Sequence, residues 1–310
     1  NVCYVGCRFC AFAQRRTDAD AYTLSMQQVG DRVDEAWAAG ATEVCMQGGI
    51  HPDLTLEEYG RWLALAKEVA PGLHLHAYSP MEIDWACERS GKEPLAVFEY
   101  LLERGLGSTP GTAAEVLDDG VRQRISPNKL PVDRWVEIVE ASHRAGLRST
   151  STVMFGHIEE PRELARHMRV IRELQERTGG ITEFVPLSFI PFNTMLGRTH
   201  GIEEISSAEN LKHTAAFRLA LGRTIANLQE TRVEKRPRHM VPTRHGDVPA
   251  QIYMPAVARE HAVLVMPGFN SNGIDEPRLA ALADDIAASG YPVMALALPV
   301  RLRLLMPAVE

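Results

Sequence analysis

Apolar residues recur at helical spacing in several stretches of the chain, and two of these stretches open with a recognisable helix start. Val29, Val33 and Trp37 lie four residues apart, just after Ser25 and Gln28. A Ser or Thr followed three residues later by Glu or Gln is typical of a capping box at a helix N-terminus. Patterns of this kind predict helices at residues 25–40, 55–66, 81–88, 94–104, 133–145, 161–177 and 208–221.

Short segments with alternating or β-branched residues lie between these helices. They predict strands at residues 42–46, 73–78, 105–110, 147–155, 181–189 and 224–229. Strand and helix alternate at intervals of about 30 residues, which is typical of repeated βα units around a parallel sheet. We therefore predict an α/β protein whose sheet curls into a TIM-like barrel. The active site of such a barrel lies at the C-terminal ends of its strands.

The pattern changes after residue 229. Residues 230–245 hold five Arg and Lys residues and two prolines, which we interpret as a solvated basic linker rather than a nucleic-acid or lipid patch. Further on, apolar runs at 262–268 and 291–298 flank a helical pattern of Leu279, Leu282 and Ile286. We therefore divide the chain into a barrel at 1–229, a linker at 230–245 and a partial strand–helix–strand segment at 246–310.

That last segment resembles the opening part of an α/β-hydrolase over residues 246–300. In such a fold the loop at 267–269 would help to form an oxyanion hole. However, the G-x-S-x-G sequence that carries the nucleophile of these enzymes does not occur in the chain. We predict no hydrolase activity for this segment.

Composition is that of a soluble globular protein, with 45% hydrophobic and 24% charged residues. No apolar run approaches the roughly 20 residues that a membrane span needs, and no signal-peptide pattern opens the chain. A net charge of −7 argues against nucleic acid as a partner. Reduced cysteines indicate a reducing compartment, so we expect a cytoplasmic protein.

Three cysteines near the start of the sequence carry its strongest chemical signal. Cys3, Cys7 and Cys10 have C-x3-C-x2-C spacing, so their thiolates can converge on one inorganic cluster. A cubane iron–sulfur cluster normally takes four thiolates, and three would leave one iron open to a substrate or cofactor. A closed zinc site needs a fourth ligand, and the nearest histidine is His51. We rank an iron–sulfur cluster first, a zinc site second and a disulfide third.

This motif resembles that of the radical S-adenosylmethionine (SAM) enzymes. The longer stretch NVCYVGCRFCAF at residues 1–12 is similar to the CofH family, the tyrosine-using half of the deazaflavin (FO) synthase system. The segment HLHAYSPME at residues 74–82 and the pair Thr112-Ala113 also match that family. The related futalosine cyclases of menaquinone synthesis tend to have Gly-Gly at the latter position.

The resemblance implies a reaction. A reduced cluster would pass an electron to SAM, yielding methionine and a radical that takes a hydrogen atom from L-tyrosine. The 4-hydroxybenzyl group of tyrosine would then join 5-amino-6-(D-ribitylamino)uracil, with release of 2-iminoacetate and 5′-deoxyadenosine. Implied partners are a CofG-like enzyme or domain and an electron donor such as ferredoxin or flavodoxin. The alternatives are a menaquinone-pathway enzyme similar to dehypoxanthine futalosine cyclase, and an inactive truncated or fused chain.

The resemblance also assigns residues to roles. A 4Fe-4S cluster would be held by Cys3, Cys7 and Cys10. SAM would be bound by Phe9, Gly48, Gly49, Ser79 and Glu115, and the catalytic candidates are His157 and Glu183. Plainer explanations exist for three of these features: a tight turn at the glycines, a helix N-terminal acid at Glu115, and a loop hydrogen bond at His157.

Two features depart from the family pattern. The strand that should precede the cysteine motif is absent from the sequence, and the likeness ends at residue 229. We therefore expect a barrel that is incomplete at both ends. Its unpaired strand edges would favour aggregation, so we expect the chain to fold poorly and to turn over weakly.

Overall fold

The computed structural model describes residues 1–225, 233–242, 247–255, 263–265, 280, 283–284, 286–287 and 292–296. The chain forms two compact units, Asn1–Ile225 and Ala226–Glu310. Each unit is described by itself below.

The first unit is built on a parallel sheet of five strands in sequential order, β1-β2-β3-β4-β5. The strands are β1 (Glu43–Met46), β2 (His74–Ala77), β3 (Ser108–Thr109), β4 (Arg148–Phe155) and β5 (Ile181–Ser188). This is the order of consecutive strands in a TIM-like barrel, and it confirms five of the predicted strands. The strand predicted at 224–229 is wrong at its first two residues, which belong to a helix, and its other residues lie outside the described part.

The helices of this unit follow the predicted sequence positions, with two additions. They are α1 (Met26–Ala38), α2 (Leu56–Val69), α3 (Pro80–Ser90), α4 (Pro94–Leu102), α5 (Asp119–Ile125), α6 (Val132–Arg144), α7 (Pro161–Thr178), α8 (Met195–His200) and α9 (Ser207–Ile225). Ser25 and Thr55 form the predicted capping boxes of α1 and α2. The short helices α5 and α8 were not predicted, because two turns or fewer leave too little apolar periodicity to detect.

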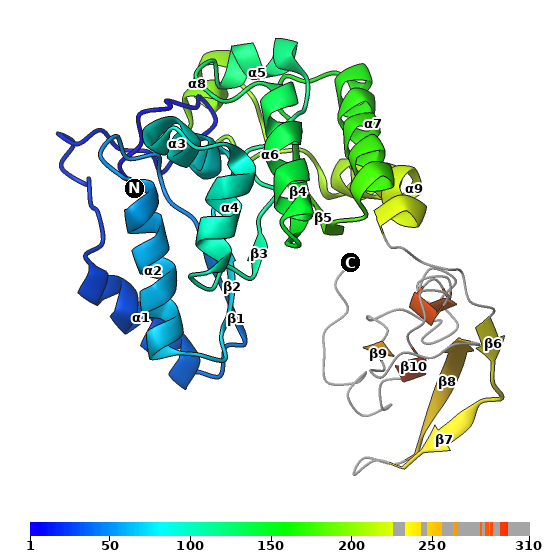
Figure 1. Ribbon diagram of the computed structural model, residues 1–310. Helices are drawn as coiled ribbons and strands as arrows, with labels where there is room; N and C mark the ends of the chain where they lie inside the picture. The colour runs from blue at the N-terminus through cyan, green and yellow to red at the C-terminus, as the bar shows by residue number, and fades with distance from the viewer. Residues whose placement is uncertain are drawn as a thin grey trace. The chain divides into compact units, whose positions relative to one another are not determined.

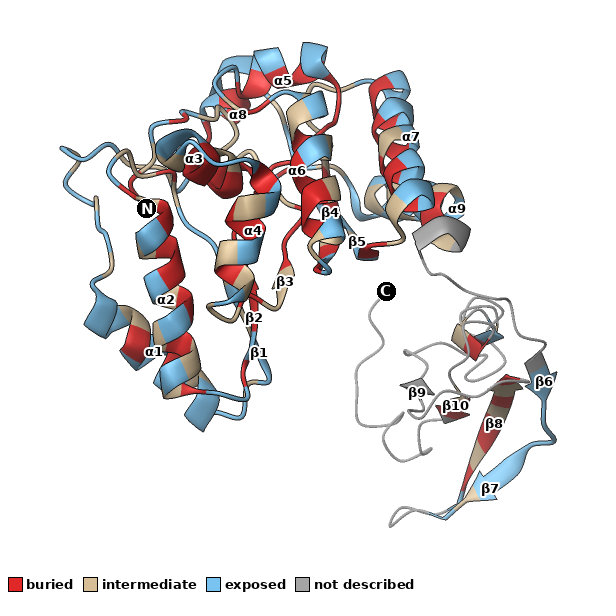
Figure 2. Ribbon diagram, in the orientation of Figure 1, coloured by how far each residue is buried: buried red, intermediate tan, exposed pale blue. Residues whose placement is uncertain are grey.

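The helices cover one face of the sheet, and the core lies between them and the strands (Figure 1). Leu63 of α2, Phe98 of α4 and Ile138 of α6 are fully buried there, opposite strand residues such as Val153. Figure 2 shows buried residues as stripes along the helices. The other face is more open, since alternate residues of β5 are exposed. The C-terminal ends of the strands are thus supported from one side and accessible from the other.

The second unit contains β6 (Val233–Lys235), β7 (His239–Val241), β8 (Val248–Pro255), β9 (Val263–Val265) and β10 (Val293–Leu296). Strands β9 and β10 pair in parallel, and five of the described residues between them, Ala280, Ala283, Asp284, Ile286 and Ala287, are helical. The predicted strand–helix–strand pattern is therefore present. The stretch at 230–245 is more than the expected connector, because β6 and β7 both pair antiparallel with β8. The loop at 267–269 lies outside the described residues.

Among the residues that the structure describes, none of the helices combines the length and the apolar character needed to cross a lipid bilayer.

Candidate functional site

A cavity of about 970 Å³ lies in the first unit where the strands end. It brings together eight of the ten residues predicted to form the site, from the start of the chain and from the loops after β1, β2 and β3: Cys3, Cys7, Phe9, Cys10, Gly48, Gly49, Ser79 and Glu115. Loops after different strands converge here because the strands are parallel, so all their C-terminal ends meet at one edge. The other two predicted residues, His157 and Glu183, do not line it.

The cysteine loop is held against the barrel by backbone hydrogen bonds. The N–H of Arg8 donates to the carbonyl of Ile125 at the end of α5 (2.8 Å), and the N–H of Leu196 in α8 donates to the carbonyl of Arg8 (2.7 Å). Gly6 has φ +69°, a conformation that favours glycine, and it turns the chain between the first two cysteines. The two short helices that the sequence did not reveal therefore hold the loop that carries the thiols.

The thiols fit an iron–sulfur cluster in their chemistry and placement. All five cysteines of the chain are free, and burial raises the pKa of Cys7 to about 11, so the metal must displace its proton. Within the described part of the chain, no three His, Cys, Asp or Glu side chains are placed to hold a single metal ion. The three thiols lie on one loop at the cavity, and thiolates are the usual ligands of iron–sulfur clusters.

The glycine turn after β1 packs against the start of the cysteine loop. A Cβ added to Gly49 would lie 2.3 Å from the carbonyl oxygen of Val2 and 3.0 Å from the Cβ of Cys3. A Cβ added to Gly48 would meet nothing closer than 3.9 Å. Gly49 is thus needed for a close approach of the chain to itself, while Gly48 has room for an added Cβ.

Ser79 is the N-cap residue of α3, and its partner is a buried carboxylate that our sequence reasoning missed. Glu82 accepts hydrogen bonds from the N–H (2.8 Å) and hydroxyl (2.7 Å) of Ser79 and from the N–H of Gly48 (3.0 Å). Burial raises the pKa of Glu82 to about 7, although these hydrogen bonds oppose the shift. The sequence did contain a signal, because Ser79 and Glu82 have capping-box spacing.

Glu115 forms a buried ion pair with Lys129, whose ammonium lies 5.2 Å from the centre of the Phe9 ring. Burial opposes the charge of Glu115, but attraction to Lys129 and to Arg122 lowers its pKa below the ordinary value. The pKa of Lys129 is raised because attraction to Glu115 and Cys7 outweighs the effect of burial. Both groups therefore remain charged. No sequence pattern singled out Lys129, since only the fold brings it to the cysteine loop.

The turn that carries Glu115 has a strained backbone. Ala113 and Glu115 have φ values of +59° and +44°, which side chains other than glycine rarely adopt. Arg122 donates to the carbonyls of Ala113 (3.1 Å) and Ala114 (2.8 Å), and the N–H of Met154 donates to the carbonyl of Glu115 (2.9 Å). Strain of this kind persists only where its surroundings impose it, and it clusters at functional sites.

His157 and Glu183 lie elsewhere. His157 accepts from the N–H of Ile158 through Nδ1 (2.7 Å), and Nε2 donates to the carbonyl of Met154 (3.1 Å). Its side chain is fully enclosed, and burial lowers its pKa. Glu183 is exposed on β5, opposite Thr150 of β4 and well before the strand ends. The catalytic roles of both residues stay predictions.

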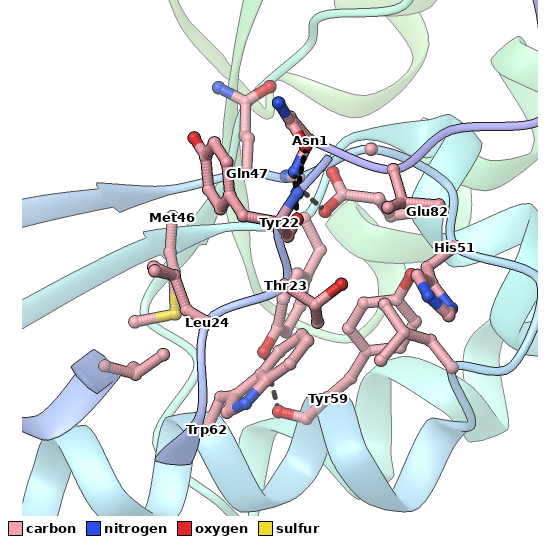
Figure 3. A pocket seen from close by; sticks show the side chains of 16 residues that line it. Asn1, Tyr22, Thr23, Leu24, Met46, Gln47, His51, Tyr59, Trp62 and Glu82 are labelled. Carbon is pink, nitrogen blue, oxygen red and sulfur yellow. Dashed lines mark hydrogen bonds between the residues drawn. The ribbon is translucent and has the colours of Figure 1, made fainter. Parts of the chain in front are cut away.

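Figure 3 shows a smaller cavity of about 200 Å³. Its lining residues shared with the larger cavity are Asn1, Tyr22, Gln47, Gly48 and Gly49. Its wall includes Tyr59 and Trp62 of α2, together with Glu82. The turn at residues 47–49 therefore separates two cavities, and Glu82 lines the smaller one.

The family profile described as the Radical SAM superfamily matches residues 1–171. The chain belongs to this superfamily, and membership implies an iron–sulfur cluster and SAM. The structure is similar to the crystal structure of methylornithine synthase (PylB), with a TM-score of 0.54 at 17% identity, covering 71% of this chain and 59% of that one. This confirms the predicted α/β barrel-type fold.

More specific relatives share far more sequence. The chain is 50% identical over 239 residues to FO synthase of Streptomyces coelicolor, covering 76% of this chain and 27% of that protein. It is 53% identical over 199 residues to FO synthase of Mycobacterium tuberculosis (H37Rv), covering 63% of this chain and 23% of that protein. It is also similar to the 5-amino-6-(D-ribitylamino)uracil–L-tyrosine 4-hydroxyphenyl transferase of Methanopyrus kandleri. The identity is 44% over 235 residues, covering 76% of this chain and 64% of that protein. The chain thus spans about a quarter of the FO synthases that it matches.

Proposed function

We propose that the first unit is a radical SAM transferase that joins the 4-hydroxybenzyl group of L-tyrosine to 5-amino-6-(D-ribitylamino)uracil. The observation that carries the proposal is the convergence of Cys3, Cys7 and Cys10 with the Glu115–Lys129 pair on one cavity. The names and identities of the relatives from Streptomyces and Methanopyrus supply the substrates.

The three thiolates would hold a 4Fe-4S cluster, and SAM would lie against Phe9, the glycine turn, Ser79 and Glu115. When bound, the cluster and SAM supply a radical that removes a hydrogen atom from the substrate. The protein's own part is to bind, orient and shield the reactants. The cavity volume of about 970 Å³ lies at the upper end of the range for small-molecule sites, about 300–1,000 Å³. That is room for a cofactor together with a substrate.

Apolar side chains make up much of the remaining wall, including Ile50, Met81, Leu187 and Phe189. With cofactor and substrate filling the cavity, such a wall would keep water from a reactive species and so protect it from side reactions. The roles predicted for Glu183, at the tyrosine amino group or the ribityl chain, and for His157, in proton transfer, are not part of this proposed site, because neither side chain lines the cavity. A CofG-like enzyme or domain and a ferredoxin or flavodoxin donor complete the proposed system.

Anaerobic reconstitution tests this function. The purified chain is loaded with iron and sulfide, reduced and incubated with SAM. We expect 5′-deoxyadenosine to form only when L-tyrosine is present, and the aryl-transfer product only when the ribitylaminouracil is added as well. Cys7→Ala should abolish iron loading, whereas Cys45→Ala, at an exposed cysteine outside the cavity, should not. Cofactor cleavage driven by a futalosine derivative instead of tyrosine would contradict the proposal.

A further inference from the structure

Glu82 differs from three other capping-box residues of the chain in the hydrogen bonds that its side chain accepts. Gln28, Glu58 and Glu163 each accept a hydrogen bond from the backbone N–H of their own N-cap residue, three positions earlier. Glu82 does the same with one carboxylate oxygen, Oε2. With the other, Oε1, it accepts from the N–H of Gly48, a residue 34 positions away. Its side chain therefore ties the turn after β1 to the start of α3.

The direction of this hydrogen bond decides which way the turn presents its polar groups. A trans peptide is planar, so its C=O and N–H point in opposite directions. Because the N–H of Gly48 points at Glu82, the carbonyl of Gln47 in the same peptide points away from Glu82. Glu82 lines the smaller cavity and not the larger one, whereas Gln47 and Gly48 line both. We infer that the carbonyl lies on the side of the larger cavity, which Gln47 lines and Glu82 does not.

The same turn cannot shift freely, because its other end is packed against the cysteine loop. Gly49 lies so close to Val2 and Cys3 that no Cβ fits between them. Glu82 is itself 2% exposed, so water does not compete for its three hydrogen bonds. The peptide between Gln47 and Gly48 is thus held from one side by Glu82 and from the other by the loop that carries the thiols.

We propose that Glu82 is the positioning residue of the SAM site: it orients the turn at residues 47–49 so that the Gln47 carbonyl faces the cavity as an acceptor for an ammonium group. The inference rests on the proposed function, in which SAM lies against this turn; the methionine part of SAM carries an ammonium group, which needs acceptor oxygens such as a backbone carbonyl. Without the carboxylate, the N–H of Gly48 loses its acceptor and the peptide is free to rotate. An N–H facing the cavity would repel the ammonium that a carbonyl attracts.

The test compares two matched substitutions in the reconstituted, cluster-loaded chain. Glu82→Leu and Glu58→Leu each remove the acceptor oxygens at the same position of a capping box, but only Glu82 reaches Gly48. The readouts are iron content, melting temperature and the dissociation constant for SAM. We expect E82L to load iron and to bind SAM about tenfold more weakly, the loss of one charge-assisted hydrogen bond. E58L should bind SAM as the wild type does, whatever its melting temperature.

Equal SAM affinity in E82L, E58L and the wild type would overturn the inference while leaving the proposed function intact. A wild type that loads no cluster or binds no SAM would overturn the proposed function, and the inference with it. Glu82→Asp separates charge from reach: the shorter side chain keeps the charge but does not span to Gly48, so we expect it to behave as E82L does.

If the variants do not fold, a measurement on the wild type alone tests whether the N–H of Gly48 points at Glu82 or at SAM. Hydrogen exchange followed on overlapping peptides reports the amide of Gly48. We expect this amide to be protected before SAM is added and its protection to stay unchanged afterwards, because Glu82 already uses the N–H. A gain in protection of Gly48 on SAM binding would show that the N–H faces the ligand, and would refute the inference.

Discussion

Gly49→Ala should damage the site through a single added methyl group. The new Cβ would lie 2.3 Å from the carbonyl oxygen of Val2, 2.9 Å from its carbonyl carbon and 3.0 Å from the Cβ of Cys3. Two of these atoms are backbone, so no side-chain rotation can relieve the contact. Gly48→Ala is the matched control, because its Cβ would have only the carboxylate of Glu82 nearby, at 3.9 Å.

The magnitude follows from the overlap. Non-bonded carbon atoms are most stable about 3.5–4.0 Å apart, so the start of the cysteine loop must move by roughly 1 Å. Overpacking of this kind costs about 1–3 kcal/mol and occasionally more, and a clash with backbone belongs at the upper end. About 3 kcal/mol corresponds to a melting temperature lower by about 6–12 °C for a unit of this size. Metal–ligand bond lengths vary by only about 0.2 Å around their standard values. A displacement of Cys3 should therefore also lower the iron content after loading.

The assay is thermal unfolding together with iron and sulfide content after anaerobic reconstitution. G48A should melt within about 2 °C of the wild type, since a well-accommodated substitution changes stability by at most about 0.5 kcal/mol, and it should load iron normally. Wild-type melting temperature and iron content in G49A would refute the reasoning, because they would mean that the cysteine loop is not packed on this turn.

Three further predictions concern buried titratable side chains. Lys129→Met leaves the Glu115 carboxylate buried without its partner, so it should lower the free energy of unfolding in urea by about 3–5 kcal/mol. Lys92→Met, at an exposed lysine, should leave that free energy almost unchanged. Equal losses of stability in the two variants would contradict this. Burial lowers the pKa of His167 to about 3, so stability should fall as pH drops below about 6.5, by about 1.4 kcal/mol per pH unit. An unchanged pH slope in His167→Asn would exclude that residue as the cause. The pKa of Glu82, raised to about 7, implies stability that is present below about 4.5 and lost as pH rises to about 7. The wild type should therefore lose stability relative to E82Q across that window, and a constant difference would disprove it.

The sequence alone determined the fold class and located the cysteine loop. Periodicity and capping signals located seven helices and five strands in the first unit, because those signals are local and depend on residues a few positions apart. The cysteine motif is local in the same sense, since Cys3, Cys7 and Cys10 lie within eight residues. The glycines, Ser79 and Glu115 were located by resemblance, and the structure brings them all to the same cavity.

Only the tertiary structure decided which groups support that cavity and how. Lys129 meets Glu115, Arg122 holds the strained turn, and Glu82 reaches Gly48 across 34 positions. No local pattern encodes such contacts, because they depend on which loops the parallel strands bring to one edge. Burial then sets the chemistry of these groups: it raises the pKa of Glu82, while a nearby cation outweighs it at Glu115. Residue types are written along the chain, but the neighbours that give them their properties exist only in the fold.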